Sequence, residues 1–210
     1  MVAISENTVA QRKAKATGTT PAKKVAAKKV RLTTVSAARK RAPGAKAAAA
    51  AAKPGPVLRY HPGKGVDDFV RQVSLATPLQ LIEIERHGVA GRFLKDVSRR
   101  LEISAVSVFD MLGVPKATAE KKSSAGEVIA GSGGQAAIGM AKLIAIAQGI
   151  VANSTATEAE GFDAAKWLGK WLGRSQPSLG GRKPAELIDT PTGVEIVGRL
   201  LGAIESGAYQ

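Results

Sequence analysis

The chain has 210 residues and a formal net charge of +14, a length that suits one domain or two small ones with a tail. It contains no cysteine, which excludes disulfide scaffolds, thiol catalysis and Cys-ligated zinc. No uninterrupted apolar run reaches the roughly 18 residues of a membrane span, and the N-terminus has no compact apolar region typical of a secretory signal. We therefore expect a cytoplasmic protein with no membrane partner.

Residues 1–64 form a low-complexity Lys/Ala-rich tail that carries the whole excess of positive charge. They hold 15 Lys/Arg and a single acid, Glu6, whereas residues 65–210 hold 16 Lys/Arg and 16 Asp/Glu. Large apolar side chains are too sparse in the tail to offset chain entropy, which predicts disorder. Its lysines would neutralise phosphates without sequence preference, so we favour a DNA-tethering arm. A solubilising extension and an organelle transit peptide are the alternatives.

Two helices are predicted after the tail. The first begins at Pro78, because Thr77 can cap it and proline suits the first helical position, and it ends at Gly88. The second runs from about residue 90 to 101, because its apolar residues recur at helical spacing: Phe93, Leu94, Val97 and Leu101.

A helix-turn-helix pattern follows between Ile103 and Lys122. Val106, Phe109 and Leu112 recur on one helix, Gly113 can adopt the left-handed turn conformation, and Pro115 prevents the helix from continuing. A short polar helix begins near Lys116. In DNA-binding proteins the second helix of this motif enters the major groove, so the candidate DNA-binding residues are Lys116, Thr118, Lys121 and Lys122. The alternative is an ordinary pair of helices with a solvated basic face.

The segment from Gly131 to Val151 combines a glycine cluster with an apolar helix. Gly131-Ser-Gly133-Gly-Gln-Ala136 matches the dinucleotide fingerprint G-x-G-x-x-G/A, but no second parallel strand is predicted, which argues against a cofactor site. We therefore expect a flexible loop that leads into a buried helix. From Ala136 onward apolar residues occupy nearly every face, which predicts a helix at the centre of a bundle or at a dimer seam.

The C-terminal segment contains both tryptophans and a run of helix-breaking residues. Trp167 and Trp171 are one helical turn apart, in the near-duplicates Trp-Leu-Gly-Lys and Trp-Leu-Gly-Arg. Gly173 and Pro177 should end this helix, and Thr190-Pro191 should begin the last one. From spacing alone the two indoles are core residues, interface residues, or one of each.

These landmarks resemble the toxin-binding domain of the Xre/MbcA/ParS-type antitoxins. The family's W-L pair matches Trp171-Leu172, which makes Trp167 an extra copy one turn earlier, and the chain departs from the family at Ser175-Gln176, where Pro-Asn is usual. The resemblance implies that the toxin-binding residues are Trp171, Leu172, Leu179, Gly180, Gly181, Pro184, Leu187, Thr190 and Gly193. We add Tyr209 and Gln210 as a free C-terminal end that could reach a toxin's substrate pocket.

The resemblance also implies an Xre-like helix-turn-helix before this module, a cognate toxin that is commonly a RES-domain enzyme consuming NAD, homodimerisation, and repression of the protein's own operator. We therefore predict an all-α fold with a disordered basic tail (1–64), a helical DNA-binding and dimerisation region (65–152) and a toxin-binding domain (153–210). We expect a nucleoid-associated antitoxin with no cofactor, metal or catalytic site, since the only histidines are His61 and His87 and no nucleophile–base set is evident. A histone-like DNA-binding protein is the alternative.

Overall fold

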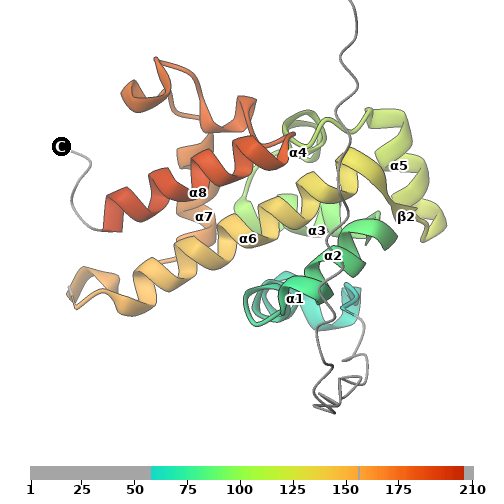
Figure 1. Cartoon of the computed structure of the whole chain (residues 1–210), viewed down its shortest axis with the longest axis horizontal. Coiled ribbons are helices and arrows are strands. Elements are labelled where there is room, and N and C mark those ends of the chain that lie inside the picture. Colours follow the sequence, from blue (N-terminus) through green and yellow to red (C-terminus); the bar gives the residue numbers. More distant parts are fainter. Residues whose placement is uncertain (1–57, 156, 206–210) are drawn as a thin grey trace, which may run out of the picture. The chain divides into compact units, whose positions relative to one another are not determined.

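A computed structural model describes residues 58–155 and 157–205, and the prediction of a mostly helical fold is confirmed for these residues. Figure 1 shows the arrangement. The α-helices are α1 (Gly65–Ser74), α2 (Pro78–His87), α3 (Arg92–Leu101), α4 (Ala105–Met111), α5 (Lys116–Ala125), α6 (Gly131–Asn153), α7 (Ala164–Leu172) and α8 (Pro191–Glu205). The short 3₁₀ turns are η1 (Pro62–Lys64), η2 (Thr157–Ala159), η3 (Pro177–Leu179) and η4 (Pro184–Glu186). Residues 1–57, and with them most of the predicted tail, lie outside the described part, as do Tyr209 and Gln210.

Helix α6 is the central element of the fold. It packs along α8 and also contacts α1, α2 and α7, as the yellow ribbon in Figure 1 shows. Its length and composition would allow it to cross a membrane, but about half of the relevant stretch is buried inside this chain, and core helices pass the same test. Of the two predicted positions, the centre of a bundle and a dimer seam, the chain itself shows the first, because helices on several sides cover the apolar faces of α6.

The glycines at the start of α6 have a packing role. The helix begins at Gly131 itself, so the expected flexible loop was wrong. A Cβ atom on Gly133 would lie 2.6 Å from the Val114 side chain, and one on Gly134 would lie 2.6 Å from the Ile129 carbonyl oxygen. These residues are therefore small because neighbouring segments pass close to the helix, and they form no βαβ turn for a dinucleotide.

A two-residue antiparallel ladder is the one departure from an all-α fold within the described residues. Strand β1 (Val89–Ala90) pairs with β2 (Val128–Ile129), with Val89 opposite Ile129. Gly88 precedes the ladder with a φ of 84°, and a Cβ atom there would lie 2.2 Å from the Ile129 carbonyl oxygen. The ladder joins the end of α2 to the start of α6.

Most helix ends lie where local sequence signals predict them. Thr77 and Gln80 form a reciprocal capping box, in which the Thr77 N–H donates to Gln80 Oε1 over 2.9 Å. Gly88 ends α2, and Gly113 takes a φ of 63° after α4. The predicted apolar face of α4 is partly wrong, because Val106 is 41% exposed and Val108 occupies the core beside Phe109.

The folded part begins earlier than the predicted boundary at residue 64. Tyr60 is 5% exposed and donates a 2.6 Å hydrogen bond to Asp96 on α3. Its ring makes edge contacts with Phe69 and Phe93, with centroids 5.6 and 5.0 Å away. Leu58 also packs against the core. The sequence pattern missed this because Leu58 and Tyr60 lie in a short stretch interrupted by proline, glycine and basic residues.

The regions predicted as 65–152 and 153–210 share one hydrophobic core. Helix α7 packs on α3 and α6, and α8 packs on α6. Two glycines allow the close approach: a Cβ on Gly139 would lie 2.5 Å from Val194, and one on Gly169 would lie 2.3 Å from the Leu101 carbonyl oxygen. The C-terminal segment therefore packs closely on the helices that precede it.

Candidate partner-binding surfaces

Helix α7 is capped and oriented by Asp163. The Asp163 carboxylate accepts hydrogen bonds from the backbone N–H groups of Ala165 and Lys166, both over 3.1 Å. It also accepts a 2.7 Å hydrogen bond from Arg100 on α3, whose guanidinium reaches Asp67 on α1 over 2.8 Å. One arginine thus ties three helices together at the point where α7 begins.

The two indoles of α7 have different environments. Trp171 is 6% exposed and Leu172 is fully buried, whereas Trp167 is half-buried. The two rings stack with centroids 5.8 Å apart and an interplanar angle of 19°. Trp171 therefore faces the core of this chain, and the outer ring of the stack belongs to Trp167.

The loop after α7 is closed by its own backbone hydrogen bonds. The Gln176 carbonyl oxygen accepts from the N–H groups of Leu179 and Gly181, both over 3.0 Å, and the Gln176 N–H donates to Arg182 over 3.0 Å. Gly180 and Gly181 both adopt positive φ, 65° and 82°, which side-chain-bearing residues rarely do. The two glycines are therefore required by the turn itself.

Helix α8 begins at a tight corner. Thr190 Oγ1 accepts a 3.1 Å hydrogen bond from the Gly193 N–H, which confirms the predicted cap. A Cβ atom on Gly193 would lie 1.7 Å from the Leu187 carbonyl oxygen, so only glycine fits there. The corner directs α8 back along α6.

Most residues implied by the family pattern are buried or partly buried in the C-terminal module (residues 160–207). Within the described part, the pattern residues that are buried are Trp171, Leu172, Pro184 and Gly193, those partly buried are Leu179 and Leu187, and those exposed are Gly180, Gly181 and Thr190. The W-L…L-G-G…P…L…T…G pattern therefore describes how the module folds more directly than what it touches. Phe162 and Trp167, which the pattern does not include, reach solvent instead, and their exposure is not visible in the sequence.

Comparisons with known proteins agree with this module. A family model described as the antitoxin Xre/MbcA/ParS C-terminal toxin-binding domain matches residues 160–207, which include α7 and its cap, both 3₁₀ turns of the loop, and α8. The chain is 34% identical over 148 residues to the Prs ADP-ribosylating antitoxin of Sphingobium sp. (strain YBL2), an alignment that covers 70% of this chain and 92% of that protein. The chain belongs to the Xre/MbcA/ParS antitoxin family. This assignment also confirms the prediction that it is not an enzyme, because these antitoxins act by binding.

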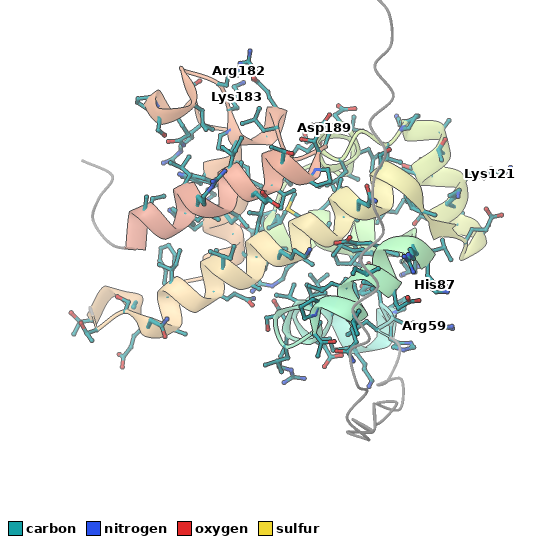
Figure 2. The ribbon with its side chains drawn as sticks, in the orientation of Figure 1. Arg59, His87, Lys121, Arg182, Lys183 and Asp189 are labelled. Carbon is teal, nitrogen blue, oxygen red and sulfur yellow. The ribbon has the colours of Figure 1, made fainter. Side chains whose placement is uncertain are left out.

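The antitoxin's candidate DNA-binding residues lie on α5 and at its start. Lys116, Thr118 and Lys121 are exposed, whereas the Lys122 ammonium donates a 2.8 Å hydrogen bond to the Val128 carbonyl oxygen. Helices α4 and α5 are joined by the turn at Gly113, as the helix-turn-helix pattern predicts. Figure 2 shows Lys121 on a different side of the described unit from Arg182 and Lys183, which lie in the loop of the toxin-binding domain.

The antitoxin's Arg100–Asp163 pair makes the stability of the folded state depend on pH. Burial by itself raises the pKa of the Asp163 carboxyl, but the hydrogen bonds from Arg100, Lys166 and Ala165 outweigh it and hold that pKa below its ordinary value. Because this pKa is lower in the folded than in the unfolded state, the ionised carboxylate stabilises the fold fully at pH values above the unfolded pKa, near 4. The contribution is lost as the pH falls through the pKa of the folded state.

Replacing Asp163 with asparagine should flatten this dependence. Asp163→Asn keeps an oxygen that caps α7 but loses the charge that faces Arg100, so we expect about 1 kcal/mol lower stability at pH 7 and a shallower decline below about pH 5. Urea unfolding followed by tryptophan fluorescence at pH 7 and pH 3 measures both. Asp189→Asn, at an exposed carboxylate before α8, is the matched control and should follow the wild type. Identical pH profiles for Asp163→Asn and the wild type would contradict the assignment.

Proposed function

We propose that this chain is the antitoxin of a type II toxin–antitoxin pair, which binds its cognate toxin with residues 160–207 and represses its own operon through DNA binding. The observation that supports toxin binding most directly is the match of residues 160–207 to the family's toxin-binding domain. In this chain that segment has its capped helix, its closed glycine loop and its tight corner. Its shape is therefore set before any partner arrives.

The toxin we propose is a RES-type enzyme that consumes NAD or transfers ADP-ribose from it. The similar Sphingobium protein is named a Prs ADP-ribosylating antitoxin, which supports this class. The family resemblance points to the same chemistry. We also propose that the C-terminal end beyond α8, with Tyr209 and Gln210, reaches the toxin's substrate pocket.

The second part of the proposal is repression. Lys116, Thr118 and Lys121 would contact operator DNA, with the basic N-terminal tail adding contacts to phosphates. The separation of Lys121 from Arg182 and Lys183 supports simultaneous binding of DNA and toxin. We propose that the antitoxin acts as a homodimer at the nucleoid in the cytoplasm.

Co-expression with the product of the adjacent open reading frame tests the function. Expression of a RES-type product alone should halt growth and deplete NAD, and the full-length antitoxin should restore both. A variant that lacks residues 207–210 should protect less well, because it loses the C-terminal end proposed to reach the toxin's substrate pocket, whereas α8 remains intact. Failure of the wild type to restore growth would contradict the function, and full protection by the truncated variant would contradict the role of the C-terminal end alone.

A further inference from the structure

Aromatic side chains that reach solvent gather at one place in the described part of the chain. Tyr60 and the three phenylalanines of α1, α3 and α4 are at most 5% exposed, and Trp171 is nearly buried. Phe162 is 44% exposed and Trp167 is half-buried. Their ring centroids are 6.4 Å apart, so they form one continuous surface at the start of α7.

This contact has a local structural role. With Asp163 as the N-cap, Phe162 and Trp167 occupy the two positions that pack together in a hydrophobic staple. A staple fixes the chain before the helix, but it stabilises the fold only through the area that it buries. Since almost half of Phe162 stays exposed, the staple explains the contact and leaves apolar area uncovered.

The exposed rings are held in place before any partner binds. Trp167 stacks on the nearly buried Trp171, and the cap that precedes α7 is fixed by Arg100. A rigid aromatic side chain loses little conformational entropy on binding, and tryptophan is enriched among the residues that dominate interface energies. The arrangement is therefore suited to anchor a protein partner.

Positive charge borders the rings at the end of α7. Lys170 follows Trp167 at i+3 on the helix, Arg174 lies two residues beyond its last residue, Leu172, and both are exposed. Among the described side chains neither forms an ion pair, whereas the neighbouring Lys166 pairs with Glu102 over 2.8 Å. Phe162 also borders an open hollow beside Val151 and Ala152 at the end of α6, which leaves room for a partner's side chain.

We propose that this aromatic face, formed by Phe162 and Trp167 with Lys170 and Arg174 at its rim, is the anchor by which the antitoxin docks on its toxin, and that the toxin presents an apolar pocket bordered by carboxylates. The inference rests on the proposed function and specifies its contact surface. Residues 160–207 match the toxin-binding domain, and every residue of the face lies within that range. Because the family's W-L pair aligns with Trp171-Leu172, Trp167 is an addition that gives this chain its own selectivity for the cognate toxin.

Titration of the purified toxin from the adjacent open reading frame with full-length antitoxin tests the anchor. Trp167→Ala and Phe162→Ala should each weaken the Kd about 30-fold, whereas Trp167→Phe should retain most of the affinity. Leu79→Ala is the matched control, since Leu79 is 74% exposed on α2, and it should bind like the wild type. Thermal unfolding of each variant checks that it is folded, and Phe162→Ala keeps the test independent of the indole stack.

Charge reversal tests the rim separately. Lys170→Glu should slow association about tenfold at low salt and reduce its salt dependence, because the rim would then repel the toxin's carboxylates. Arg86→Glu, at a 72% exposed arginine on α2, should leave the association rate unchanged. If the Trp167, Phe162 and Lys170 variants all bind the toxin within twofold of the wild type, the aromatic face is not the anchor, and the proposed function is unaffected. A wild-type chain that binds no toxin would overturn the proposed function and this inference with it.

Discussion

Gly169→Ala should lower the free energy of unfolding by about 2 to 3 kcal/mol and the melting temperature by roughly 5 to 10 °C. The added Cβ atom would lie 2.3 Å from the Leu101 carbonyl oxygen and 3.0 Å from the Leu101 side chain, so α7 would have to move away from α3. The backbone oxygen has little freedom to move, because it sits at the end of a helix in the core. Helix α7 carries Trp167, so toxin neutralisation should fall with stability.

Gly173→Ala is the matched control for this prediction. Gly173 follows the second tryptophan as Gly169 follows the first, but it is exposed, and a Cβ atom there would lie at an ordinary 3.7 Å from the nearest atom. Its φ of −84° suits alanine, so we expect no loss and a gain of up to about 1 kcal/mol. Thermal and urea unfolding of both variants measure the difference. Equal stabilities would show that α7 and α3 are not closely packed.

Removal of residues 1–57 should weaken DNA binding by about a thousandfold at physiological salt. This segment holds 13 Lys/Arg and one acid. If about six of these cations contact phosphates, the slope of log K against log salt should become shallower by about 5 units. The truncated chain should begin at Leu58 and keep Tyr60, because Tyr60 packs in the core and hydrogen-bonds to Asp96. Fluorescence anisotropy with an operator fragment between 50 and 300 mM salt gives both quantities.

Toxin neutralisation is the internal control for this truncation. The proposed antitoxin function predicts that residues 58–210 still protect cells from the toxin, because the toxin-binding domain is intact. A histone-like protein would lose its function altogether. Lys121→Ala should reduce operator binding while leaving most of the salt dependence unchanged, which separates contacts of α5 from those of the tail. An unchanged slope after truncation would exclude the tail as a phosphate-binding arm.

Local signals in the sequence predicted most of the helices and the turns between them, but not helix α1 or the start of α6 at Gly131. Thr77 and Thr190 cap helices, and Gly113 and Gly180 allow left-handed turns, because each of these effects depends on a few neighbouring residues. The ordered glycine, proline and threonine positions of the C-terminal module were also sufficient to identify its family.

The sequence by itself therefore determined the helical class, most of the helix ends and membership of an antitoxin family. Only the tertiary structure decided which of two equivalent neighbours faces the core, because that depends on what packs against each one. Trp171 is buried in the core, whereas Trp167 is only half-buried. Gly169 lies against α3, whereas Gly173, in a near-identical local sequence, is exposed. In the same way, Phe162 and Trp167 become a partner-binding candidate only because the described part of the chain leaves a portion of each ring uncovered.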